Sequence, residues 1–420
     1  MKIKTTALPY EQVIALPPWA HQPPLRPNWF FRTLLKLVSI PDLLATGFTC
    51  EKSGMERLEK NEPCLVLMNH SSFIDLKIAM HLLYPRPVNI VCTSDGFVGK
   101  EWLMRHIGCI PTNKFVNDLL LVRDLRYALH TLKNTVLLFP EASYSFDGTA
   151  TPLPESLGKC VKLLKVPVIM IRTHGAFTRD PLYNGLQLRK VRVSAEMNYL
   201  LSPEEIAGMT VEELNRRLAE EFTFDNFRWQ QENRVRVPEP FRADGLERVL
   251  YQCPHCGTEG RMEGKGIHLT CHACGKEYTL TEYGRLEALD GDSAFTHVPD
   301  WYQWEREEVR RQLAAGTYAM DLDVDIGMLV DSRAIYKVGA GHLHHGKDGF
   351  RLTGCGGQLD YTQKPQASYS LYADYFWYEI GDMICIGDRN ALYYCFPKTP
   401  FPVAKARIAA EELYKMAKSR

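Results

Sequence analysis

Short apolar runs recur along the first half of the chain, and longer stretches with helical spacing separate them. The runs cover residues 64–68, 88–92, 135–139, 166–172 and 191–197, and the helical stretches cover about 75–83, 99–106, 117–133 and 154–164. Alternation of buried strands and helices at this spacing predicts an α/β domain. A helix over about 203–221, opened by Ser202-Pro203-Glu204-Glu205, is expected to close this domain.

The pattern changes to a period of two in the last hundred residues. Strands are predicted over residues 318–330, 334–338, 349–353, 368–372, 376–380, 383–387 and 391–396, with helices at about 300–315 and 402–418. Alternating apolar residues joined by Gly, Asp and Asn turns are typical of antiparallel sheets. Seven short strands followed by one helix look like a pleckstrin-homology-like barrel, so we expect a β-rich domain over residues 299–420.

Residues 1–45 are predicted to form an N-terminal segment. Its first part is rich in proline, which predicts extended or irregular chain, and Asn28 can cap a helix over 29–39. On a helical wheel, Arg32 and Lys36 lie in a narrow polar arc, and apolar side chains fill the opposite side. The helix either lies in a membrane surface or packs on the next domain. A basic excess of three over the first fifty residues favours the membrane.

Composition limits the classes of protein that fit this chain. Its 420 residues suffice for two or three domains, and 50 basic residues balance 50 acidic ones, so we expect no nucleic-acid partner. No stretch reaches the roughly 20 apolar residues that span a bilayer, and no signal core opens the chain. Most of the 12 cysteines are scattered in apolar contexts, which favours a reducing compartment. We therefore expect a cytoplasmic protein, peripheral on the cytoplasmic face of a membrane.

Two Cys-x-x-Cys-Gly motifs stand 14 residues apart, the first with Cys253 and Cys256 and the second with Cys271 and Cys274. Two such turns bring four thiolates to one metal, and this spacing predicts a zinc ribbon over residues 248–285. Four thiolates leave no open coordination position, so the zinc is expected to be structural. Redox chemistry is the alternative, but a single motif would suffice for it.

The apolar run at 64–68 leads into His70, and Asp75 lies five positions further on, in the first turn of the next predicted helix. The carboxyl ends of strands are where open α/β sheets place their chemistry. A carboxylate at this spacing can hold one imidazole nitrogen and leave the other free as a general base. Incidental pairs of this kind are common. The pair is therefore a catalytic hypothesis with a structural alternative.

Two motifs together resemble those of the glycerolipid acyltransferases of the lysophosphatidic acid acyltransferase type. The first is Asn69-His70 followed by Asp75 after four residues, and the second is Phe139-Pro140-Glu141-Ala142-Ser143-Tyr144-Ser145. Two weaker blocks, at residues 108–114 and 166–171, follow the family's order. The resemblance covers about residues 45–235. It implies an α/β acyltransferase domain with a mixed sheet over residues 46–240.

The resemblance also implies an activity. A fatty acyl group would pass from acyl-CoA or acyl carrier protein to the free hydroxyl of a lysophospholipid, foremost 1-acyl-glycerol-3-phosphate, which yields phosphatidic acid. His70 would act as the base, and Asp75 would orient it. Substrate-binding roles are implied for Asn69, Lys114, Glu141, Ser143 and Tyr144.

Three positions depart from the family pattern. Tyr144 replaces an arginine, Ala142 a glycine, and Lys114 a second arginine. Arginine binds phosphate through two parallel hydrogen bonds, whereas lysine offers a point charge and tyrosine no charge. Either the acceptor has another head group, or a replacement charge comes from Arg172, Arg123 or Lys100. The departures also suggest a rival hypothesis, a catalytically silent membrane adaptor whose ribbon and β-rich domain bind proteins.

Overall fold

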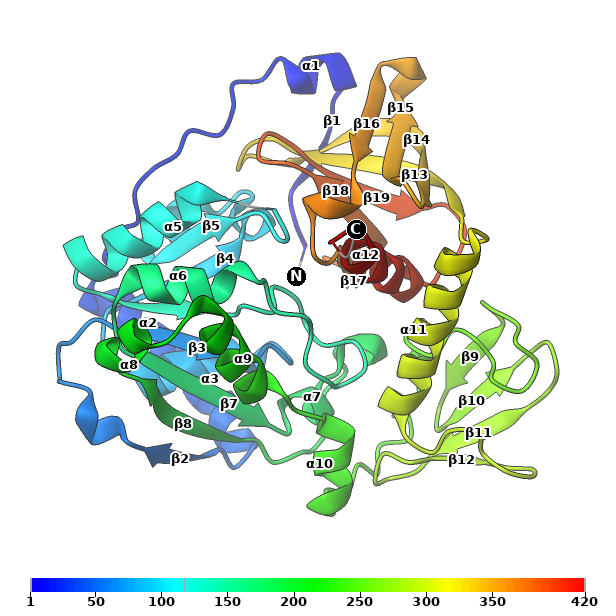
Figure 1. Ribbon diagram of the computed structural model, residues 1–420, viewed down its shortest axis with the longest axis horizontal. Helices are drawn as coiled ribbons and strands as arrows, with labels where there is room; N and C mark the ends of the chain where they lie inside the picture. Colours follow the sequence, from blue (N-terminus) through cyan, green and yellow to red (C-terminus); the bar gives the residue numbers. More distant parts are fainter. Residues whose placement is uncertain (1, 117, 419–420) are drawn as a thin grey trace.

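The computed structural model describes residues 2–116 and 118–418. In the described chain, a seven-stranded sheet with the order β2-β8-β7-β3-β6-β4-β5 forms the first domain (Figure 1). The pairing of β7 with β8 is antiparallel and the other pairings are parallel, so β2 and β8 run opposite to the other five strands, and the predicted mixed sheet is confirmed. The strands are β2 (Thr49–Ser53), β3 (Leu65–Met68), β4 (Val88–Thr93), β5 (Cys109–Thr112), β6 (Thr135–Leu138), β7 (Val168–His174) and β8 (Ser194–Leu201).

Two of these strands were not predicted. Strand β2 has the sequence Thr-Cys-Glu-Lys-Ser and lies at the edge of the sheet, mostly exposed, so it needs no apolar run. Strand β5 lies at the opposite edge and has only four residues, among them Pro111. A proline is tolerated in a strand at the edge of a sheet but argues against one in the sequence.

Helices cover both faces of this sheet (Figure 1). They are α2 (Trp29–Ala45), α3 (Ile74–Leu83), α4 (Glu101–His106), α5 (Leu119–Arg126), α6 (Ser156–Leu164), α7 (Ala176–Arg179), α8 (Pro203–Gly208), α9 (Val211–Phe222) and α10 (Asn226–Glu232). A π-helical turn at Tyr127–Thr131 continues α5. The single helix predicted over 203–221 is two helices, because Thr210 caps a new one by accepting a hydrogen bond from the N–H of Glu213.

The N-terminal segment is more ordered than its prolines suggest. Strand β1 (Thr5–Ala7) pairs in parallel with strand β14 of the C-terminal domain, and helix α1 (Tyr10–Ile14) follows it. The next stretch runs along the α/β domain, where the Asn89 side chain donates a hydrogen bond to the carbonyl of Leu25. Helix α2 then continues to Ala45, six residues beyond its predicted end at residue 39.

A four-stranded antiparallel sheet with the order β12-β11-β10-β9 carries the cysteine motifs. Its strands are β9 (Met262–Lys265), β10 (His268–Cys271), β11 (Glu277–Leu280) and β12 (Leu286–Ala288). Helix α11 (Val298–Ala315) links this sheet to the last domain (Figure 1).

The last domain is an antiparallel sheet in which β13 is the long central strand, with the order β16-β15-β14-β13-β19-β18-β17. Its strands are β13 (Met320–Leu329), β14 (Ile335–Gly346), β15 (Gly349–Gly354), β16 (Leu359–Gln363), β17 (Tyr372–Trp377), β18 (Gly381–Gly387) and β19 (Leu392–Pro397). Helix α12 (Val403–Lys418) ends the described chain. The β-rich domain with a final helix is confirmed, and its pleckstrin-homology-like class stays a prediction.

Two predictions within this domain are wrong. Strands at 368–372 and 376–380 are replaced by the single strand β17, whose pairing with β18 is irregular between Asp374 and Trp377. Phe376, Tyr378 and Glu379 have left-handed backbone angles and turn the chain back into β18. Strand β16 was missed, because its exposed polar residues alternate with few apolar ones.

The β-rich domain packs directly on the α/β domain. The Oδ2 of Asp95 accepts hydrogen bonds from the hydroxyl of Tyr372 (2.9 Å), the indole N–H of Trp377 (3.2 Å) and the hydroxyl of Tyr394 (3.4 Å). One buried apolar cluster also includes Phe115 of the α/β domain. Because the buried carboxylate of one domain accepts hydrogen bonds from three side chains of the other, the two domains pack as one structural unit.

Candidate active site

Strand β3 positions the first motif, and the neighbouring strand β6 positions the second. Leu67 of β3 lies beside Leu138 of β6 in parallel register, so both strands end at the same edge of the sheet. The N–H of Ser145 donates a hydrogen bond to the carbonyl of His70 (3.2 Å). Two segments about 70 residues apart in sequence therefore form one site, as open α/β sheets place it.

The imidazole of His70 and the carboxylate of Asp75 face each other, with 3.3 Å between Nδ1 and Oδ2. Asp75 is fully buried, and its Oδ2 accepts hydrogen bonds from the N–H groups of Ser71 (2.6 Å) and Ser72 (2.9 Å). Its Oδ1 lies 3.3 Å from the hydroxyl of Thr173. Three protein donors thus fix this carboxylate before it holds the imidazole.

The His70 ring lies between two aromatic rings. Its centroid is 4.3 Å from that of Phe139 and 4.2 Å from that of Tyr144. Burial lowers the pKa of His70, although Asp75 acts in the opposite direction. About 20% of the side chain stays exposed, and none of the described residues hydrogen bonds to Nε2. A neutral imidazole with a reachable Nε2 is suited to accept a proton from a hydroxyl.

This lowered pKa predicts the pH dependence of the reaction. A protonated imidazole cannot act as a base, so kcat/KM should fall as the pH drops through the pKa of His70. Because burial lowers that pKa, the fall should have its midpoint below the ordinary histidine value of 6.5. Initial rates across a pH series check this. A midpoint above 6.5 would contradict the burial of a neutral His70.

Glu141 ties the two motifs together from a buried position. Its Oε2 accepts a hydrogen bond from the N–H of His70 (2.8 Å), and its Oε1 accepts one from the N–H of Thr151 (2.8 Å). Burial raises the pKa of Glu141 to about 7, despite these two donors. In this arrangement the side chain positions the loop around the imidazole. Its implied contact with the acceptor stays a prediction.

The other residues with implied substrate-binding roles differ in whether their polar groups are already bonded within the protein. Asn69 bonds across to β7, where its Oδ1 accepts from the N–H of Thr173 (2.8 Å). Ser143 has a buried hydroxyl without a hydrogen-bond partner among the described residues. Lys114 places its ammonium 3.9 Å from the ring centroid of Tyr372, and burial lowers its pKa. Ser143 and Lys114 therefore keep polar groups that a substrate could engage.

Two of the proposed replacement cations are already engaged elsewhere. The guanidinium of Arg172 bonds to the side chain of Glu221 (3.3 Å), and that of Arg123 bonds to Nδ1 of His21 (2.9 Å). Sequence reasoning missed Thr173, which orients both Asn69 and Asp75. Its place directly after the predicted strand at 166–172 was the available signal, because that strand ends at the same edge of the sheet.

The cysteine motifs form a second candidate site. The Sγ atoms of Cys253, Cys256, Cys271 and Cys274 all lie within 4.8 Å of one another. Four sulfurs at this separation fit a tetrahedral zinc ion, whose Zn–S bonds are about 2.3 Å long. His272 is bonded to Glu263 at 2.7 Å and is outside this set. The structure thus gathers the predicted ligands, and zinc itself stays a proposal.

The chain is similar to a protein family and to a solved structure. Residues 49–173 match the family model of the Acyltransferase family. A similar solved structure is the 1-acyl-sn-glycerophosphate (LPA) acyltransferase PlsC from Thermotoga maritima, with 18% identity and a TM-score of 0.37. That similarity covers 46% of this chain and 76% of PlsC.

Proposed function

We propose that this chain, whose residues 49–173 match the Acyltransferase family model, transfers a fatty acyl group to the free hydroxyl of a lysophospholipid. The donor would be a thioester, either acyl-CoA or acyl carrier protein. The proposed acceptor among the lysophospholipids is 1-acyl-glycerol-3-phosphate. The observation that carries the proposal is the pairing of His70 with Asp75, because it leaves a neutral and reachable Nε2.

In the proposed reaction, Nε2 of His70 removes the proton of the acceptor hydroxyl, and Asp75 stabilises the imidazolium that forms. The hydroxyl oxygen attacks the thioester carbonyl and gives a tetrahedral intermediate. The C–S bond then breaks, the imidazolium returns its proton to the leaving thiolate, and the ester is released. No nucleophilic serine or cysteine of the protein is required.

The tetrahedral intermediate needs hydrogen-bond donors for its oxyanion. The loop after β6 offers several backbone N–H groups, but that of Ala142 is bonded to the carbonyl of Phe139 and that of Ser145 to the carbonyl of His70. We therefore assign the oxyanion to the N–H groups of Ser143 and Tyr144, with the unpartnered hydroxyl of Ser143 beside them.

An acceptor panel tests the proposal. Purified protein is incubated with an acyl-CoA and with lysophospholipids that differ in head group, and diacylated products are measured by mass spectrometry. The proposal predicts product with at least one acceptor. The rival adaptor hypothesis predicts lipid binding without product for the whole panel.

A lipid acceptor also implies contact with a membrane, and helix α2 supports this. Six of its large apolar side chains are exposed, whereas Phe31 and Leu43 are buried against the domain. Arg32 bonds to the carbonyl of Pro85, and Lys36 lies over the ring of Tyr84. The exposed large apolar residues of α2 are Trp29 (70%), Phe30, Leu34, Leu37 (56%), Val38 (56%) and Leu44 (75%). An outward apolar stripe of this size is typical of a membrane-binding surface.

The stripe continues onto helix α4, where Trp102 is 66% exposed and contacts the ring of Phe31. Within the part of the chain that the structure describes, no helix is long and apolar enough to cross a bilayer. We propose that α2 and α4 lie in the membrane surface. Helix α2 packs on α3, the helix that follows His70, so the site would be held close to the lipid.

Charging the stripe should release the protein from vesicles. The double variant Leu37→Glu/Val38→Glu is expected to lower binding at least about tenfold, because burial of each such side chain contributes roughly 1.5–3 kcal/mol. Cosedimentation with vesicles of phosphatidylcholine and phosphatidylglycerol measures this. The matched control is Leu289→Glu, which charges an exposed leucine on the cysteine-bearing domain. Equal vesicle binding by both variants and wild type would contradict the proposal that α2 lies in the membrane surface.

A further inference from the structure

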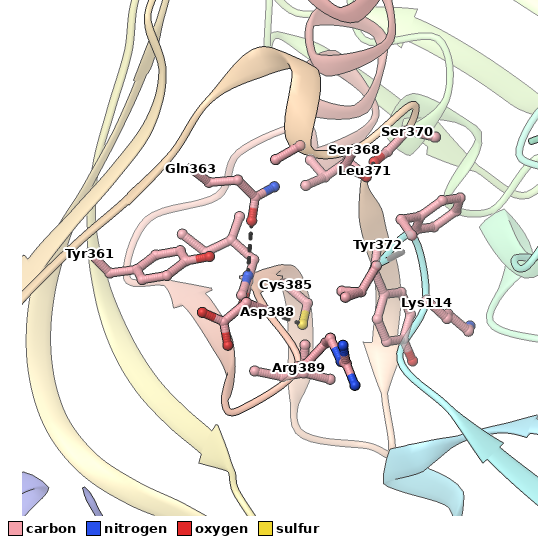
Figure 2. A pocket seen from close by; sticks show the side chains of 16 residues that line it. Lys114, Tyr361, Gln363, Ser368, Ser370, Leu371, Tyr372, Cys385, Asp388 and Arg389 are labelled. Atoms are coloured by element: carbon pink, nitrogen blue, oxygen red, sulfur yellow. Dashed lines mark hydrogen bonds between the residues drawn. The ribbon is translucent and has the colours of Figure 1, made fainter. Parts of the chain in front are cut away.

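A cavity of about 260 Å³ lies between the α/β domain and the β-rich domain. Figure 2 shows Lys114 and Tyr372 on one side of it and Tyr361 and Gln363 on the opposite side. Voids left by packing are seldom larger than a water molecule, whose share of liquid volume is about 30 Å³. The cavity is several times larger and is partly open to solvent, so it has room and access for a ligand.

Several polar groups of the cavity wall are bonded within the protein, whereas the ammonium of Lys114 faces the ring of Tyr372. The Oε1 of Gln363 accepts from the N–H of Gly387 (3.0 Å), and the hydroxyl of Ser370 donates to Glu411 (2.6 Å). The hydroxyl of Tyr372 donates to Asp95. Carbon surface fills much of the rest of the wall, from Phe115, Val116, Leu371, Ile386 and Leu392. Beside the charged groups of Lys114, Asp388 and Arg389, this carbon surface suits the apolar part of a ligand.

The cavity adjoins the catalytic loop. Lys114 lines the cavity, and its charge also contributes to the lowered pKa of His70. Phe115 lines it as well and belongs to the apolar cluster on which Ala142 of the catalytic loop packs. The segment 114–116 therefore lines the cavity and, through this cluster, also packs near the catalytic loop. At the other side, the exposed Ala367 lies at the cavity's edge.

We infer that this cavity binds a fatty acyl chain of a substrate, so that the β-rich domain sets the chain-length preference of the enzyme. The inference rests on the proposed function, which brings an acyl chain to the donor and another to the acceptor. Most of the cavity's walls come from the β-rich domain, so this domain would be part of the substrate site. The acyl chain would pass beside Lys114 on its way to His70.

Two variants change the size of the cavity in opposite directions. Ala367→Trp adds a large side chain at an exposed edge, where folding should tolerate it. Leu371→Ala removes a buried wall residue and enlarges the space. The control is Leu289→Trp, an exposed position on the cysteine-bearing domain. Each methylene of the acyl chain that no longer fits in the cavity should lower kcat/KM about fourfold, because burial of one methylene contributes roughly 0.8 kcal/mol.

The experiment compares kcat/KM in two series, acyl-CoA donors of graded length with one acceptor and lysophospholipids of graded length with one donor. We expect Ala367→Trp to shift the preference toward shorter chains and Leu371→Ala toward longer ones, in one of the two series. That series identifies the substrate whose chain enters the cavity. Unchanged profiles in both series for both variants would overturn the inference.

Binding of the fluorescent fatty acid cis-parinaric acid gives a second readout that needs no turnover. We expect wild type and Leu289→Trp to bind it alike and Ala367→Trp to bind it at least about fivefold more weakly. Equal binding by all three would overturn the inference. If wild type makes no product from any acceptor, the proposed function fails, while the parinaric acid measurement still decides whether the cavity takes an acyl chain.

Discussion

Replacing His70 with alanine is expected to lower kcat about 10²- to 10⁴-fold, the usual contribution of a positioned general base. The acceptor hydroxyl would then lose its proton to water, whose basicity is far lower. The fold should survive, because the His70 side chain makes one hydrogen bond, to Asp75, and that carboxylate keeps three other donors. Initial rates and circular dichroism of the same preparations measure both effects.

A second histidine variant separates this effect from a general one. His344 is exposed on the β-rich domain and paired with Asp321, so His344→Ala should leave the rate within about twofold of wild type. If His70→Ala loses less than tenfold, the base is another group. If both variants lose the same share of the wild-type rate, the effect is not specific to the active site.

Removal of the metal site is expected to have the largest effect on stability. Replacing Cys253 with serine should abolish zinc binding, with wild type holding about one zinc per chain. Structural zinc contributes on the order of 10 kcal/mol in isolated zinc-finger peptides, far above the roughly 1 kcal/mol of an average substitution. Cys253 and Cys271 are also buried in the largest apolar core, which extends to Trp301 of α11. Metal analysis and thermal unfolding measure these effects.

The control for this variant is a cysteine outside the cluster. Cys355 is partly buried in the β-rich domain, and Cys355→Ser should keep the zinc content and most of the stability. Full zinc content in the Cys253→Ser variant would contradict the four-cysteine site. A wild-type protein purified without any zinc and with an unchanged melting temperature after chelation would contradict it as well.

The catalytic pair could be predicted from the sequence because its signal is local. Strand β3 is a run of four fully buried residues, and the helix starts at Ile74, so only a short loop separates His70 from Asp75 in the first helical turn. The cysteine cluster was predictable for the same reason, since each motif is a short turn. Both predictions needed only neighbouring residues.

The contact between the β-rich domain and the α/β domain was not predictable. Asp95 and Tyr372 are 277 residues apart, and nothing in either local pattern links a carboxylate after β4 to a tyrosine at the start of β17. The stacking of Tyr144 on His70 was also hidden, because the sequence showed only the loss of an arginine. Tertiary packing decides such contacts, and a single sequence does not contain a periodic signal for them.

The central claim is that His70 removes the proton of a lipid hydroxyl while an acyl thioester is bound. Its most direct test is transfer of an isotopically labelled acyl group from acyl-CoA to a lysophospholipid, with the labelled diacylated product quantified by mass spectrometry for wild type and His70→Ala. We predict labelled product from wild type at a rate at least about a hundredfold above that of the variant. Equal product from both, at the level of a protein-free control, would contradict the account.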